Sequence, residues 1–104
     1  IKAALPDIKL MILEPFCLNG AATWNIESQP HRFDIFKAEV KKRAEKARAV
    51  AEKYNIKFIP LQEKFDQAAK SAEDTYWLID GGHPTAMGHE LIKNEWIAAF
   101  EEIK

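Results

Sequence analysis

The sequence Asp80-Gly81-Gly82-His83-Pro84 joins a candidate catalytic pair to the start of a helix. Its carboxylate stands three residues before its imidazole, and the two glycines between them permit a tight turn, so Asp80 can reach the ring of His83. Proteins build a general base from an imidazole that a carboxylate orients in this way. The stretch therefore predicts that Asp80 and His83 form a catalytic pair.

A helix is expected directly after this loop. Pro84 presets a backbone angle that suits a first helical turn, and the hydroxyl of Thr85 can cap exposed N–H groups. Apolar residues then recur at helical spacing as far as Ile103, and we expect these to face inward: Leu91, Ile92, Trp96, Ala99, Phe100 and Ile103. Such a helix would hold the ring of His83 steady beside a nucleophile.

Upstream, the pattern predicts a strand, a helix and a second strand. The nearly continuous apolar run Ile8–Leu13 is typical of a strand covered on both faces in a parallel sheet. Residues Arg32–Tyr54 have the spacing of a long amphipathic helix, Asn55 is a plausible left-handed stop, and Ile56–Pro60 resembles a second strand. Two strands joined by a helix make a right-handed crossover with parallel strands.

Two more segments complete the expected fold. Leu61–Ala72 has the spacing of a shorter helix, and Phe16–Pro30 is a polar loop beyond the carboxyl end of the first strand. Ligands bind at that end of open α/β sheets, so Phe16 and Trp24 could line a pocket, although ordinary loop packing explains them equally well. Trp77 is most simply a core residue.

Composition excludes several classes of protein. The 104 residues, 47% hydrophobic, suffice for one domain at most, and 15 basic against 16 acidic residues leave a net charge of −1, which implies no nucleic-acid partner. No apolar run approaches the roughly 20 residues of a membrane-spanning helix. Cys17 stands alone, which rules out an internal disulfide and favours a reducing compartment such as the cytoplasm without fixing the localisation.

The sequence resembles a known family at two places. Residues 76–89, which read Tyr-Trp-Leu-Ile-Asp-Gly-Gly-His-Pro-Thr-Ala-Met-Gly-His, closely resemble the last conserved block of the SGNH hydrolases, or GDSL-type esterases and lipases; Leu13–Phe16 resembles the end of their fourth strand. The resemblance implies a three-layer α/β/α flavodoxin-like fold with a parallel sheet, of which this chain supplies about two strands and three helices. Residues 1–104 would then form the C-terminal portion of one such domain.

The resemblance also implies an activity, which is serine-dependent hydrolysis of esters through an acyl-enzyme. In that mechanism His83 is the base and then the acid, and Asp80 fixes its tautomer and stabilises the imidazolium. No cofactor or metal is needed. The substrate would be a small ester, an acetylated carbohydrate or a lipid, and no substrate-binding residue can be assigned.

One part of the family pattern has no counterpart. The nucleophilic serine stands in a Gly-Asp-Ser context in the family, whereas Ser28 follows Glu27 and Ser71 follows Lys70 here. We therefore expect the chain alone to be inactive, and to associate with the missing N-terminal half of the same domain or with a second copy. The first residue is Ile1 rather than methionine, so we also expect further sequence upstream.

Two other interpretations stay open. The chain could be a small non-catalytic α/β interaction module or an inactive fragment, in which the Asp80–His83 pair merely staples its loop. A metal site formed by Asp80, His83 and His89 is conceivable, but no Cys-x-x-Cys or His-Glu-x-x-His spacing supports it. His89 is more simply a helix residue that packs or faces solvent.

Overall fold

A computed structural model describes Ile1 and residues 3–104 of the chain. Its elements, in chain order, are β1 (Met11–Leu13), α1 (Arg32–Lys53), β2 (Lys57–Ile59), α2 (Gln62–Ala68), α3 (Asp74–Trp77) and α4 (Ala86–Ile103). The strands and the three longer helices are those that the sequence predicted. The four-residue α3 is an addition.

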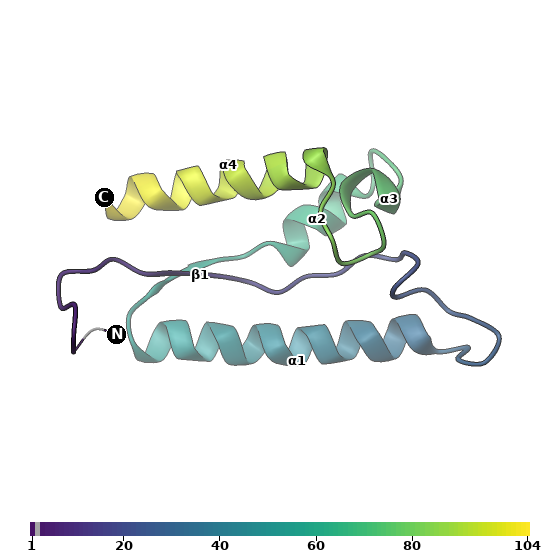
Figure 1. Ribbon diagram of the computed structural model, residues 1–104, viewed down its shortest axis with the longest axis horizontal. Coiled ribbons are helices and arrows are strands. Elements are labelled where there is room, and N and C mark those ends of the chain that lie inside the picture. The colour runs from purple at the N-terminus through teal and green to yellow at the C-terminus, as the bar shows by residue number, and fades with distance from the viewer. Residues whose placement is uncertain (2) are drawn as a thin grey trace.

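The elements form three layers. β1 and β2 pair in parallel, with Ile12 opposite Phe58, and Figure 1 shows α1 on one side of this sheet and α4 on the other. α1 packs against both strands, and α4 packs against β2. The predicted α/β fold class, with a parallel sheet between helices, is therefore confirmed.

β1 differs from the prediction in length and burial. The strand begins at Met11 rather than at Ile8, because its partner β2 has only three residues with which to pair. It is also not covered on both faces, since Leu13 is 40% exposed. In the described residues β1 pairs along one edge only, so the other edge is open.

α1 begins and ends at signals that lie outside it. The side-chain carbonyl of Asn25 accepts a hydrogen bond from Phe33 N at 2.9 Å near the start of the helix. After the helix, Asn55 adopts a φ of 54°, which is the left-handed stop that the sequence predicted. The guanidinium of Arg48 lies 4.5 Å above the ring of Phe58, so α1 also covers β2 with a cation–π contact.

The core lies where the strands meet α2 and the inner face of α4. Phe65 is fully buried and stacks on Phe16 with ring centroids 4.6 Å apart; the rest of the buried cluster is Leu18, Ile59, Leu61, Leu78 and Ala99. Trp77 is half-buried against this core. The prediction that Trp96 and Phe100 face inward is wrong: each is 39% exposed, and the two rings stack on each other at 5.2 Å.

Candidate active site

The loop between α3 and α4 is held at its base by backbone hydrogen bonds. Ile79 N donates to His83 O at 2.8 Å, and Thr85 N donates to Trp77 O at 2.9 Å, so the two ends of the loop run side by side. The hydroxyl of Thr85 accepts from Gly88 N at 3.1 Å, which is the helix cap predicted from the sequence. The loop is thus anchored to α4.

The structure brings Asp80 and His83 together within this loop. Nδ1 of His83 lies 2.7 Å from Oδ2 of Asp80, and the second oxygen, Oδ1, accepts from the backbone N–H groups of His83 and Gly82, each at 2.9 Å. These two N–H groups, His83 first, and then the ring of His83 lower the pKa of Asp80 from 3.8 to about 2. Asp80 is therefore an ionised acceptor throughout the neutral range.

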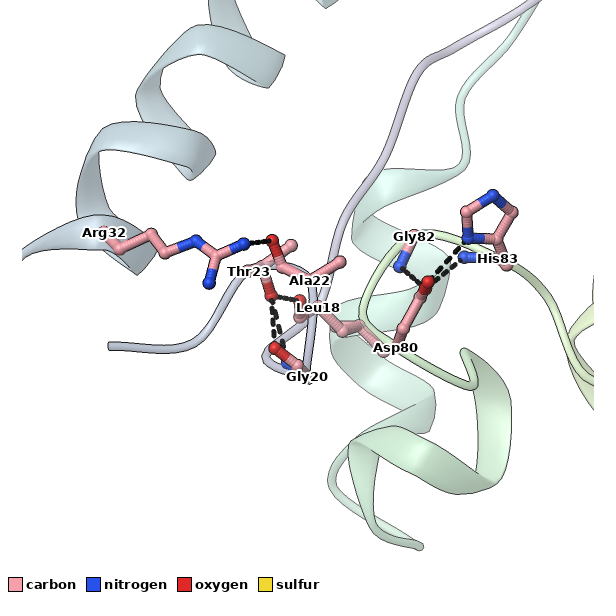
Figure 2. A network of polar contacts seen from close by, with 8 residues as sticks. All are labelled: Leu18, Gly20, Ala22, Thr23, Arg32, Asp80, Gly82 and His83. Carbon is pink, nitrogen blue, oxygen red and sulfur yellow. Dashed lines mark hydrogen bonds and ion pairs between the residues drawn. The ribbon is translucent and has the colours of Figure 1, made fainter. Parts of the chain in front are cut away.

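An ionised acceptor fixes the tautomer of the imidazole. When the ring of His83 is neutral, its proton belongs on Nδ1, where the carboxylate of Asp80 receives it, so Nε2 carries the free lone pair. The side chain of His83 is 80% exposed, and Figure 2 shows the ring directed away from the loop, with its second nitrogen pointing away from Asp80. This arrangement can take a proton from a hydroxyl presented from outside the loop.

A second loop, which follows β1, supports the first. Leu18 N donates to Gly81 O at 2.9 Å, and Ala22 N donates to Asp80 O at 2.8 Å. Gly20 packs so closely that a Cβ at that position would lie 2.3 Å from the carbonyl carbon of Asp80. This contact is not predicted from the sequence. Gly20 is the only sign of it, because a glycine often marks a place where two backbones meet.

The two aromatic residues of the β1 loop lie in different surroundings. Phe16 is half-buried in its stack on Phe65, so ordinary packing explains it and it does not line a pocket at the site. Trp24 is 47% exposed, on the loop that supports Asp80. Trp24 therefore stays a candidate for contact with a ligand.

In the described residues, neither the two serines nor the cysteine forms a hydrogen bond with His83. The hydroxyl of Ser71 donates to Ala68 O at the end of α2, and Ser28 lies exposed in the turn that Ile26 and Gln29 close. Cys17 is buried, and burial raises the pKa of its thiol, which opposes thiolate formation. Neither a serine hydroxyl nor the cysteine thiol of these residues is therefore placed to give its proton to His83.

The structure also bears on His89, on a metal site and on membrane spanning. His89 is exposed on α4, as expected of a helix residue that faces solvent. Within residues 1 and 3–104, no group of three or more His, Cys, Asp or Glu side chains is arranged to hold a metal ion. Over the same residues, no helix combines the length and the apolar character that crossing a membrane requires.

Comparison with known proteins gives one informative result. Neither the protein-family models nor the curated proteins match the chain. Among solved structures, the chain is similar to a candidate GDSL-like lipase from Parabacteroides merdae ATCC 43184, with 36% sequence identity and a TM-score of 0.67. The match covers 94% of this chain and 42% of the Parabacteroides chain.

This similarity extends over nearly the whole chain and agrees with the layered α/β fold. The chain is therefore similar to the SGNH hydrolases, the GDSL-type esterases and lipases, and the coverage is consistent with the C-terminal half of their domain. It spans less than half the length of the Parabacteroides protein.

Proposed function

We propose that this chain supplies the general base of a serine-dependent ester hydrolase. The observation that carries the proposal is the 2.7 Å contact between Nδ1 of His83 and the carboxylate of Asp80, with the rest of the ring exposed. A histidine whose role is only to hold its loop in place does not need its second ring nitrogen to be exposed. The similarity to a candidate GDSL-like lipase supports the same chemistry.

In the proposed reaction, Nε2 of His83 removes the proton of a serine hydroxyl while the serine oxygen attacks the ester carbonyl carbon. The imidazolium, stabilised by Asp80, then gives this proton to the oxygen of the leaving alcohol, which leaves an acyl-enzyme. A water molecule attacks the acyl-enzyme in the same way: His83 takes its proton and returns it to the serine as the acid is released. Protons and bonds balance without a metal or cofactor.

The serine and the oxyanion donors must then come from another polypeptide segment. We propose that this segment is the remaining part of an SGNH domain, because the chain spans only 42% of the related structure. Two observations support such a partner. β1 has an open edge, and large apolar side chains such as Ile35 are exposed at 63%. A second copy of the chain is the alternative partner.

The experiment compares hydrolysis of p-nitrophenyl acetate by the 104-residue chain alone and by the same chain fused behind the N-terminal part of the Parabacteroides protein. We expect only background hydrolysis from the chain alone, because covalent and oxyanion catalysis are both missing. The fusion should be active. In it, His83→Ala should lower kcat by about three orders of magnitude or more, and Asp80→Asn should also cost heavily by leaving the wrong tautomer.

His89→Ala is the matched control, since it removes an exposed imidazole from α4 and should leave kcat unchanged. Full activity of a folded fusion that carries His83→Ala would refute the assignment. In that case the pair is a loop staple and the chain a non-catalytic module. Appreciable turnover by the chain alone would contradict the need for an outside serine.

A further inference from the structure

Thr23 lies at the centre of the contact between the two loops. Of the polar side chains in the described part of the chain, it alone is buried, and it is 0% exposed. Its hydroxyl donates to Leu18 O at 2.6 Å and accepts from Gly20 N at 2.9 Å, as Figure 2 shows. One hydroxyl thus satisfies a buried carbonyl and a buried N–H, and it fixes the path of the backbone from Leu18 to Gly20.

This segment controls the direction of one peptide group in the catalytic loop. Leu18 N–H donates to Gly81 O at 2.9 Å. Because a peptide unit is planar and trans, the direction of the Gly81 carbonyl also sets the direction of the next N–H, that of Gly82. That N–H donates to Oδ1 of Asp80 at 2.9 Å. A hydrogen bond made on one side of the peptide therefore aims the donor on its other side.

The catalytic loop needs such support because of its glycines. Gly81 adopts a φ of +96°, and a Cβ there would lie 2.5 Å from both Leu18 O and Oγ1 of Thr23. Glycine permits this close approach, but it also gives a free loop more backbone conformations than any other residue. Contacts from outside the loop must select one of them.

We propose that Thr23 is a positioning residue for His83. Its hydroxyl holds Leu18, Leu18 directs the Gly81–Gly82 peptide, and that peptide holds the carboxylate of Asp80 that orients the ring. Thr23 touches neither substrate nor a reacting atom. The consequence for catalysis rests on the function proposed above, whereas the effect on Asp80 can be measured without any activity.

The first measurement titrates the carboxyl carbon of Asp80 by NMR in the 104-residue chain. The variants are Thr23→Val, which keeps the shape and removes the hydroxyl, Thr23→Ser, which keeps the hydroxyl, and Thr75→Val, the same change at an exposed threonine of α3. We expect Thr23→Val to raise the pKa of Asp80 from about 2 toward 3.8, and the other two variants to leave it in place.

The second measurement uses the active fusion described above. Thr23→Val should lower kcat about tenfold or more with little change in KM, because a misdirected base loses transition-state stabilisation rather than substrate binding. Thr23→Ser should restore kcat. If the pKa of Asp80 responds while no fusion shows activity, the positioning role stands and the esterase assignment fails.

Two results would overturn the proposal. One is a folded Thr23→Val chain in which Asp80 titrates as in the wild type. The other is amide hydrogen exchange of Leu18 and Ala22 in the wild type at the rate of an unstructured peptide, which would show that the two loops do not hold each other. If Thr23→Val fails to fold, the proposal is tested by the hydrogen exchange of Leu18 and Ala22 and by the titration of Thr23→Ser. A raised pKa of Asp80 in Thr23→Ser would contradict a role for the hydroxyl.

Discussion

Asp80 combines two functions in one side chain. One carboxylate oxygen binds the ring of His83, and the other closes the loop by accepting two backbone N–H groups. The oxygen that shapes the loop therefore also sets the position from which the other oxygen orients the ring. Any change in the charge of Asp80 should affect both the loop and the base.

This coupling predicts a dependence of stability on pH. The folded pKa of Asp80, about 2, lies below the ordinary value of 3.8, so its contribution to the free energy of unfolding is complete above about pH 4 and is lost as pH falls through 2. Asp80→Asn should remove this contribution. Chemical denaturation at several pH values measures the free energy of unfolding of the wild type and of Asp80→Asn. The difference between the two free energies should become smaller from pH 5 to pH 2. A difference that stays constant over this range would contradict the coupling.

At the residue scale the pair was predictable and its support was not. The spacing of Asp80 and His83 placed them on one turn, because a contact across three residues depends on local geometry. Gly20 packs against Asp80, far along the chain, and Thr23 acts on the catalytic loop only through Leu18, whose N–H reaches Gly81. A single sequence carries no signal for a contact between two separate loops. In sequence, a buried threonine in a polar loop also looks the same as an exposed threonine. The catalytic role of the pair itself stays a prediction.

At the scale of elements, a distant side chain caps α2. Leu61, the residue before the helix, has no side chain that could accept a hydrogen bond, and Oε1 of Glu14 accepts from Leu61 N at 2.9 Å and from Gln62 N at 2.8 Å instead. Gln62 in turn bonds the backbone N–H and carbonyl of Cys17. The segment after β1 is therefore fastened to the start of α2.

Removing this cap should destabilise the fold. Glu14→Ala leaves two N–H groups without their carboxylate, so we expect the free energy of unfolding to fall by about 1–2 kcal/mol. Glu27→Ala is the control, because Glu27 is exposed in the β1 loop. Urea denaturation followed by circular dichroism measures both variants. Equal midpoints for the two would show that the carboxylate of Glu14 contributes nothing to α2.

The longer elements were predicted well, and the shorter ones less well. The apolar spacing of Arg32–Tyr54 is sustained over many turns, and the structure confirms a helix there from Arg32 to Lys53. α3 has only four residues, which is too few for a period to show. The length of β1 depends on how much of β2 lies beside it. Pairing of this kind is a property of the fold rather than of the strand.

At the scale of the whole molecule, the fold leaves much apolar surface uncovered. The chain is elongated, with extents of 51 × 25 × 19 Å, and a two-stranded sheet separates its two long helices (Figure 1). Large apolar side chains are exposed on both of these helices: Ile35, Phe36 and Val50 on α1, and Met87, Trp96, Ile97 and Phe100 on α4. Surface of this kind marks an interface when it is extensive.

We expect the isolated 104-residue chain to associate. Two strands with open edges make a weak sheet, and burying the exposed apolar faces of α1 and α4 against another chain would stabilise it. Sedimentation velocity at micromolar concentration should show a dimer or larger species.

Ile35→Lys should weaken this association, because Ile35 is 63% exposed and a charge there is costly to bury. Ala49→Lys is the matched control, since it adds the same charge at another exposed position of α1. Helix content by circular dichroism should be unchanged in both variants. A wild-type chain that sediments as a monomer and melts cooperatively would contradict the prediction, and would mean that this half of the fold is stable without a partner.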